Sequence, residues 1–326
     1  MTEGTQQAGE ALPKARAADR WWRRVLMGWM DDSHGTWGST VAFLLPALVI
    51  FALFTAYPTI KTIWNSFFII HPNGTNQYIG FSNYIQILTS DVVFRHAVIN
   101  TFIWATMSPI FDVCVGFILA LFIYSKIPLS RFFRVVWFTP VLISYVVIAV
   151  LWRWIFNDDW GALNTLLRAV GLGFLATPWL ALPKTALWAL IFVDSWKWIG
   201  FHMIVFLAAL HALPSEVLEA AELDNCGWWH KIWSVIVPMT RNTFAALLIL
   251  SFIGKMKIFD LVWVMTRGGP LWSTETVSTY VYKRAFDWST FDLGYPSAIA
   301  TIWFFVVLVL VLLLTYLFRR REQLEY

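Results

Sequence analysis

Charge is scarce in this sequence. Asp, Glu, Lys and Arg make up 13% of its 326 residues, whereas about a quarter of the residues in soluble domains are charged. Hydrophobic residues make up 59% and aromatic residues 18%, and the mean hydropathy is +0.63. These proportions exclude an ordinary water-soluble domain and predict that most of the chain lies in a lipid bilayer.

Patterns typical of enzymes are also missing. The two cysteines, Cys114 and Cys226, lie in an apolar run and in an expected cytosolic segment, so we expect no disulfide between them. Gly254 and Lys255 are adjacent, but a P-loop also needs an upstream glycine and a following serine or threonine. The histidines lack the spacing of a metal site. We therefore expect no catalytic residue, no metal site and no ATP hydrolysis in this chain.

Long apolar runs dominate the sequence instead. A membrane-spanning helix needs about 20 mostly apolar residues to cross about 30 Å of hydrocarbon. The clearest run, 298–318, has no charge and is followed by three consecutive arginines. The six expected spans are Thr40 to Lys61, Val98 to Tyr124, Val135 to Phe156, Thr185 to Leu210, Thr243 to Met265 and Tyr295 to Phe318. The expected fold class is an all-α membrane protein.

The distribution of Lys and Arg predicts the orientation, because basic loops are retained in the cytosol. Thirteen lie on the side of the two termini: Lys14, Arg16, Arg20, Arg23, Arg24, Lys126, Arg131, Arg134, Lys231, Arg241, Arg319, Arg320 and Arg321. Seven lie on the other side: Lys61, Arg95, Arg168, Lys184, Arg267, Lys283 and Arg284. We expect both termini in the cytosol. The basic residues form short clusters beside apolar runs, so they do not indicate nucleic-acid binding.

The chain divides into four expected parts. Residues 1–39 form an uncleaved cytosolic tail, in which DRWWRRVLMGWM is either an interfacial amphipathic helix or a cap on the bundle. Residues 40–93 hold the first span and an external connection, where FSNYIQILTS is long enough for a short helix. Residues 94–318 form the membrane core with a loop at 211–240, and residues 319–326 are a second cytosolic tail.

The loop 211–240 interrupts the apolar pattern between spans four and five. Good helix formers follow Pro214, with Ser215 as a possible N-cap, until Asp224, Asn225 and Gly227 break the helix. A second helix is expected over 228–237, ended by Pro238. The sequence therefore predicts a compact helical hairpin outside the bilayer, which can transmit motion as a rigid body.

This hairpin resembles the EAA loop of the permease subunits of ABC importers. The matching residues are Glu219, Ala220, Ala221, Asp224 and Pro238. Asn225 replaces the usual glycine and Val237 the usual leucine, but Asn tolerates the left-handed backbone that the turn needs. The similarity extends over about Gly80 to Phe318, and KIFDLVWVMTRGGPLWSTET, 257–276, is similar to the external Gly-Gly-Pro turn of sugar permeases.

The resemblance implies a type I ABC importer permease fold, similar to the larger maltose-type membrane subunit, in the cell inner membrane. It implies that the hairpin docks on an ATPase through Glu219, Ala220, Ala221, Asp224, Asn225 and Gly227. The implied partners are a second permease, two ATPase subunits that bind ATP and Mg, an extracytoplasmic sugar-binding protein and membrane lipid, but no nucleic acid. The implied substrate is a disaccharide, trehalose before maltose or glycerol phosphate.

Several charged residues fall in or near the expected spans, where each costs about 2.5 to 3.5 kcal/mol on insertion scales. These are Asp112, Arg153, Asp194, Lys197, Lys255, Lys257 and Asp260. Asp194, Lys197 and Phe201 share one helical face, which suits either a sugar site with aromatic walls or a structural pairing of Asp194 with Lys197 or Lys255. The resemblance implies a substrate path formed by Asp194, Lys197, Trp198, Phe201, Ser251, Gly254 and Lys255.

Two other classes of function compete with the importer. An ion-driven secondary transporter would use charges such as Asp112 or Asp194 as proton sites, but such folds commonly show inverted repeats, which the sequence lacks. An intramembrane enzyme would need a paired nucleophile and base, or a metal cluster. Neither can be assembled from this sequence.

Overall fold

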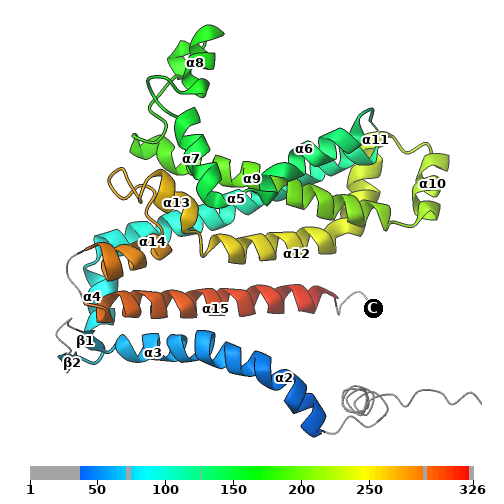
Figure 1. Ribbon diagram of the computed structural model, residues 1–326. Coiled ribbons are helices and arrows are strands. Elements are labelled where there is room, and N and C mark those ends of the chain that lie inside the picture. The colour runs from blue at the N-terminus through cyan, green and yellow to red at the C-terminus, as the bar shows by residue number, and fades with distance from the viewer. Residues whose placement is uncertain (1–36, 71–74, 126, 289–291, 323–326) are drawn as a thin grey trace, which may run out of the picture. The chain divides into compact units, whose positions relative to one another are not determined.

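The computed structural model describes residues 37–70, 75–125, 127–288 and 292–322 of the chain (Figure 1). It is largely helical, which confirms the predicted fold class. Within the described residues, five helices are long and apolar enough to cross a membrane, and the number is six if a bent pair of helices is counted as one span. The chain divides into one unit that ends at Lys61 and a second that begins at Thr62.

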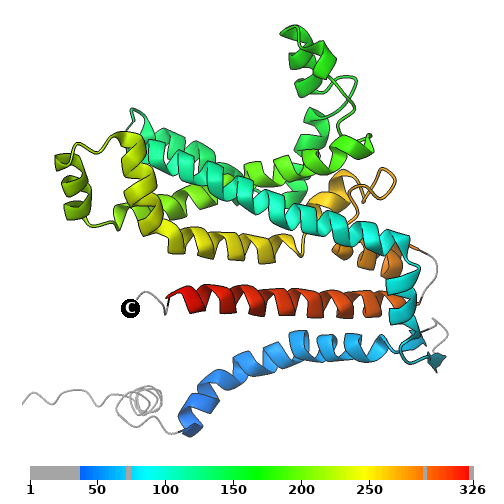
Figure 2. The same cartoon turned by 180° about the vertical axis from the view of Figure 1, so that it is seen from behind.

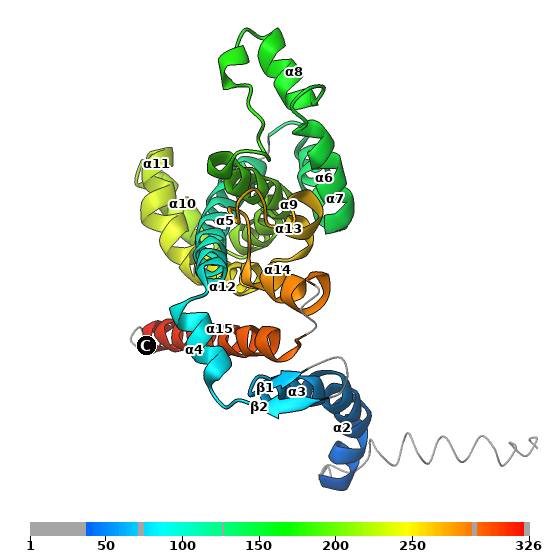
Figure 3. The ribbon, with the colours of Figure 1, turned by 90° about the vertical axis from the view of Figure 1, so that its left-hand side faces the viewer.

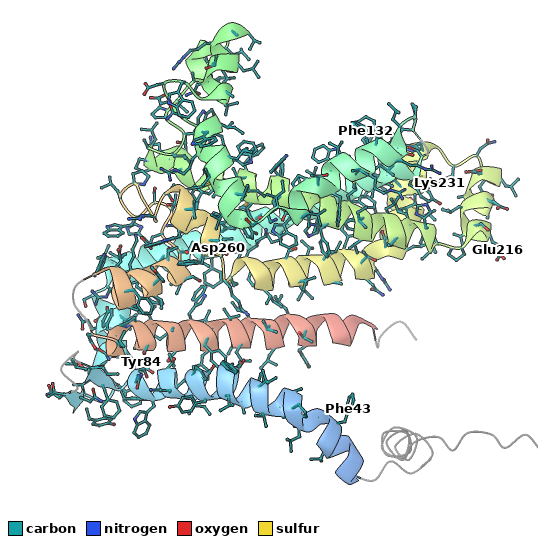
Figure 4. All side chains as sticks on the ribbon, viewed as in Figure 1. Phe43, Tyr84, Phe132, Glu216, Lys231 and Asp260 are labelled. Atoms are coloured by element: carbon teal, nitrogen blue, oxygen red, sulfur yellow. The ribbon has the colours of Figure 1, made fainter. Side chains whose placement is uncertain are left out.

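The first span is one helical run made of α2 (Trp37–Phe51), the π-helical turn η1 (Ala52–Ala56) and α3 (Tyr57–Asn65). Its apolar stretch is Phe43–Asn65, close to the predicted range. Its apolar side chains are largely exposed, as at Phe43, which Figure 4 labels and which is 74% exposed. The DRWWRRVLMGWM segment lies outside the described residues.

A small motif of two strands and a helix follows the first span. Strand β1 (Phe68–Ile70) pairs antiparallel with β2 (Asn76–Tyr78), and α4 (Ser82–Thr89) confirms the short helix predicted in FSNYIQILTS. The amide of the buried Asn83 donates to the carbonyl oxygen of Ser66 at 2.9 Å, which ties α4 to the end of α3. The two strands are too short for the sequence pattern to have revealed them.

Three long helices form the centre of the second unit, as Figure 2 shows from behind: α5 (Val92–Tyr124), α9 (Pro183–His211) and α12 (Val237–Lys255). Helix α5 begins six residues before the predicted Val98, because Asp91 caps it by accepting from the Phe94 amide at 2.9 Å. Helix α9 agrees with the predicted fourth span within two residues. Apolar side chains from all three helices fill the core between them.

Two glycines allow the closest helix contacts. A Cβ at Gly116 of α5 would lie 2.6 Å from the Cβ of His202 on α9, and one at Gly200 of α9 would overlap the backbone carbonyl of Trp137. Small residues let helix backbones approach in membranes, where packing rather than water drives association. Positions 116 and 200 therefore set the distances between α9 and its two neighbours.

Replacing Gly200 with valine should lower the melting temperature of the purified protein by about 5 °C or more, because the added carbons must push two backbones apart. The matched control is Gly173→Ala, where the added Cβ would meet its nearest atom at an ordinary 3.7 Å. A thermal unfolding measurement in detergent compares the variants. Equal stability of both variants would show that α9 does not pack on Trp137 as described.

The predicted third span, Val135 to Phe156, is wrong as a single straight helix. It consists of α6 (Ser130–Leu142) and α7 (Tyr145–Ile155), which meet at an angle of 104°. Pro140 weakens the end of α6 because proline lacks an N–H, and Ser144 starts α7 as its N-cap. A connecting stretch with α8 (Ala162–Ala169) and the 3-10 turn η2 (Gly173–Leu175) follows.

The predicted fifth span and the predicted end of the hairpin at Pro238 are also wrong. Helix α11 (Trp228–Lys231), the π-helical turn η3 (Ile232–Ile236) and α12 form one helix of 28 residues from Trp228 to Lys255. Pro238 is tolerated because it is the second residue of α12, just beyond η3, whose wider turn loosens the backbone before the missing N–H. The span therefore ends at Lys255 instead of Met265.

The remaining elements are α13 (Asp260–Met265), α14 (Val277–Tyr282), the π-helical turn η4 (Lys283–Asp287) and α15 (Gly294–Glu322). Helix α15 contains the predicted last span, apolar over Gly294–Tyr316. It packs against α5 and α14 through a core that includes Tyr280, Ile299 and Trp303. Figure 3 shows α14 beside α12 and α13 in this unit. The orientation of the termini stays a prediction.

Candidate functional site

The carboxylate of Asp194 is a fully buried meeting point of four helices. On α5, Trp104 Nε1 and Ser108 Oγ donate to its Oδ2 atom at 2.8 and 3.1 Å. On α7, the Tyr145 hydroxyl donates to Oδ1 at 2.8 Å. On α12, Lys255 Nζ lies 2.6 Å from Oδ2. Asp194 therefore joins α5, α7, α9 and α12 in one polar network.

A second buried carboxylate shares the same ammonium group. Asp112 of α5 has an oxygen 3.6 Å from Lys255 Nζ, and its Oδ2 accepts from Ser108 at 3.4 Å. Its other oxygen, Oδ1, is buried and has no hydrogen-bond partner among the described residues. The Lys255 side chain is 5% exposed, so little water screens the three charges. Of the two pairings left open for Asp194, the structure has the one with Lys255.

A cavity of about 500 Å³ opens beside this network. Five of the seven residues expected on the substrate path line it: Trp198, Phe201, Ser251, Gly254 and Lys255. Asp194 and Lys197 lie behind this wall, where Asp194 binds Lys255 and Lys197 contacts the end of α6. The sequence missed six further lining residues, which are Tyr145, Leu250, Lys257, Ile258, Phe259 and Asp260.

The cavity wall combines aromatic rings with polar groups. The rings of Trp198 and Phe201 meet edge to face with centroids 5.8 Å apart, and Ser251 Oγ lies 2.7 Å from His202 Nε2. Lys255 Nζ lies 5.5 Å from the centre of the Trp198 ring. Such a surface can stack against a ring and form hydrogen bonds at once. The sequence had marked Asp260 only as a charge in or near an expected span, and it gave no signal for Phe259, because both residues follow the unpredicted end of α12.

The hairpin expected to couple to an ATPase has a defined turn. Helix α10 (Ser215–Leu223) ends when the Cys226 amide donates to the Ala221 carbonyl at 3.0 Å and the Asn225 amide to the Glu222 carbonyl at 3.1 Å. This is a Schellman motif, and its left-handed residue is Asn225 at φ +54°. The predicted left-handed Asn is confirmed. Ser215 is the first helical residue rather than the N-cap, which is Pro214.

The two helices of the hairpin are joined by an ion pair. Lys231 Nζ of α11 lies 2.6 Å from Glu222 of α10, and Figure 4 labels Lys231 and Glu216 on these facing helices. Glu219 and Asp224 are exposed beside this pair, and the Leu223 side chain is 87% exposed. The hairpin thus presents an acidic surface together with several exposed large apolar side chains, among them Leu223, Trp228 and Trp229.

The Gly-Gly-Pro turn between α13 and α14 packs against a buried ion pair. Glu275 is fully buried and forms an ion pair with Lys283, and a Cβ at Gly268 would collide with the Glu275 carboxylate. The Asn100 amide of α5 donates to the Glu275 carbonyl at 3.0 Å. Burial raises the pKa of the Glu275 carboxyl, an effect that the contacts with Lys283 and Thr279 partly offset. The predicted turn at Gly268, Gly269 and Pro270 is confirmed.

Known proteins with similar sequences share this architecture. The model of a family described as "Binding-protein-dependent transport system inner membrane component" matches residues 112–323. The probable ABC transporter permease protein YurN of Bacillus subtilis is 36% identical over 290 residues, which cover 86% of this chain and 96% of YurN. The alpha-glucoside transport system permease protein AglF of Rhizobium meliloti is 28% identical over 305 residues, 88% of each chain.

A solved structure agrees with the fold. A chain in the crystal structure of a bacterial alginate ABC transporter, in complex with an alginate pentasaccharide-bound periplasmic protein, superposes with a TM-score of 0.76. The two chains are 24% identical, and the match covers 92% of this chain and 98% of the other. At this identity the likeness supports the fold and leaves the ligand open.

Proposed function

The chain belongs to the binding-protein-dependent transport system inner membrane component family, and from this premise we propose that it is the membrane-spanning permease subunit of an ATP-driven sugar importer. It would form the translocation path with a second permease. Two ATPase subunits, which bind ATP and Mg, would drive it, and an extracytoplasmic binding protein would deliver the sugar.

One structural observation is the main support for coupling between an ATPase and the cavity. The helix Trp228–Lys255 begins in the exposed hairpin and ends at Lys255, beside the cavity. Its 28 residues correspond to a length of about 42 Å, which exceeds the thickness of the hydrocarbon layer. A displacement of Glu219, Ala220, Ala221, Asp224, Asn225 and Gly227 by an ATPase would therefore move Lys255 relative to Asp194.

We assign the cavity beside Lys255 as the sugar path, with Trp198, Phe201, Ser251 and Gly254 in its wall. Its volume of about 500 Å³ lies within the usual range of about 300 to 1,000 Å³ for small-ligand sites. In this assignment Asp194 and Lys197 shape the path from behind. A disaccharide is the proposed substrate, and trehalose is the first to test because AglF is named for alpha-glucosides.

Purification tests the assembly. A tagged copy of the chain, extracted from its own membrane in mild detergent, should co-elute with an ATPase and a second membrane subunit in stoichiometric amounts. We expect co-elution with an ATPase because the hairpin leaves the apolar Leu223 side chain exposed in the isolated chain. Elution of the chain alone, together with sugar transport by that pure chain in liposomes, would contradict the proposal.

Replacing Phe201 with alanine should lower the maximal uptake of trehalose by about tenfold, because the lost ring contact is worth about 1.4 kcal/mol. Uptake by the reconstituted importer at saturating binding protein is the measurement. Phe192→Ala is the matched control, since Phe192 is an aromatic residue of the same helix that lies outside the cavity. Equal rates for the two variants would remove Phe201 from the path.

A further inference from the structure

The break between α6 and α7 exposes backbone oxygens inside a membrane-spanning segment. The last carbonyl groups of any helix lack partners within that helix. Inside a bilayer these groups need a partner from the protein, because no water is present to supply one. At this break the carbonyls of Pro140, Val141 and Ile143 point at one place, between α6 and α9.

The side chain of Lys197 fills that place. Its Nζ atom donates to the carbonyl oxygens of Pro140, Val141 and Ile143 at 3.2, 3.0 and 2.5 Å. Lys197 is 4% exposed, and Nζ lies 5.1 Å from the centre of the Tyr145 ring. An ammonium group has three N–H donors, which matches three acceptors. In the described part of the chain, the contacts of Nζ are carbonyls and aromatic rings instead of a paired carboxylate.

We propose that Lys197 is a tethered cation that occupies a monovalent-cation site made by the broken third span. Carbonyl dipoles at the end of a helix attract positive charge, and aromatic faces add to this attraction. In ion-driven transporters, backbone carbonyl groups of unwound helix segments coordinate the transported sodium ion or proton. Here the side chain supplies the charge, so the site needs no ion from solution.

The ammonium group of Lys197 helps to position Tyr145, a residue of the cavity wall. The break leads directly into Tyr145, the first residue of α7, which lines the cavity. The Tyr145 hydroxyl donates to Asp194 at 2.8 Å and accepts from Trp198 Nε1 at 2.5 Å. With Lys197 removed, the carbonyls of Val141 and Ile143 must seek other partners, whereas that of Pro140 keeps the Ile143 amide at 3.2 Å, so the break and Tyr145 both shift. The consequence for transport rests on the proposed function, whereas the site itself does not.

Chemical rescue tests the site. In the complete purified complex, Lys197→Ala should lower the melting temperature by about 5 °C or more. n-Propylammonium, which has the atoms removed by this substitution, should restore the melting temperature in a saturable manner, and choline at equal ionic strength should not. Uptake of sugar by the variant should recover several-fold under the same conditions. Lys184→Ala, at an exposed lysine of the same helix, should show neither loss nor rescue.

If Lys197→Ala does not yield folded protein, two other variants test the same site. Lys197→Arg retains cationic N–H donors and should remain closer to the wild type in melting temperature than Lys197→Met, which matches the size without the charge. Equal melting temperatures of the two variants, or equal effects of n-propylammonium and choline on Lys197→Ala, would overturn the assignment. Rescue of the melting temperature without rescue of uptake would uphold the site and count against the proposed function alone.

Discussion

Replacing Asp194 with asparagine should abolish transport and lower the melting temperature of the complex by about 6 °C or more. The isosteric change removes the charge that Lys255 contacts at 2.6 Å, while the ammonium stays buried. Removal of one partner of a buried ion pair costs about 3 to 5 kcal/mol, since the other charge is left without water or a close partner. Asp112 is the next carboxylate, but it lies 3.6 Å from Lys255.

Two further variants test whether the effect comes from the ion pair of Asp194 with Lys255. Asp112→Asn is the matched control, and its effect should be clearly smaller because Lys255 keeps its closer partner. The double variant Asp194→Asn with Lys255→Met removes the closer pair and should recover part of the lost melting temperature, because Asp112 then stays buried without its cation. Thermal unfolding of the wild type and the three variants measures these differences. A larger loss for Asp112→Asn than for Asp194→Asn would show that Asp194 is not the central carboxylate.

Charge reversal in the hairpin should separate the permease from its ATPase. We expect Glu219→Lys combined with Leu223→Asp to weaken association by at least about 100-fold, which corresponds to about 2.7 kcal/mol. Both side chains are exposed on α10, so the folded hairpin tolerates the changes while a partner surface would not. The amount of ATPase retained on the tagged permease, and the melting temperature of the permease alone, are the two readouts.

The control for this pair is Asp159→Lys, a charge reversal at an exposed carboxylate outside the hairpin. It should leave the retained ATPase unchanged. Membrane insertion of the hairpin variant should also stay normal, because the turn depends on backbone bonds of Ala221 and Glu222 that neither substitution removes. Full retention of ATPase by the hairpin variant would exclude this surface as the docking site.

The sequence predicted the existence of the helices well because length and hydrophobicity decide which segments cross a bilayer. The predicted course of the helices was wrong at two prolines. Pro140 lies inside the predicted third span, Val135 to Phe156, yet the chain breaks beyond it, where Lys197 on another helix donates to the carbonyls at the break. Pro238 was expected to end a helix, yet η3 lets the helix continue. In both cases the outcome depends on neighbours that one segment does not reveal.

The polar face of α9 also has partners that its own sequence does not reveal. Helical spacing correctly placed Asp194 and Lys197 on one side of the helix. Spacing could not show that they turn to different partners, Asp194 to Lys255 and Lys197 to the carbonyls that follow Pro140. These partners come from segments more than fifty residues away in the chain. The hairpin was easier to predict because its turn is made by residues close together in the sequence.

ATP-driven uptake in liposomes is the most direct test of the account. The purified complex is reconstituted with ATP on the side of the ATPases, and radiolabelled trehalose is added with its binding protein on the other side. We predict uptake that requires both ATP and the binding protein and that disappears with the hairpin variant of Glu219 and Leu223. Uptake by this chain alone, driven by a sodium or proton gradient without ATP, would contradict the account.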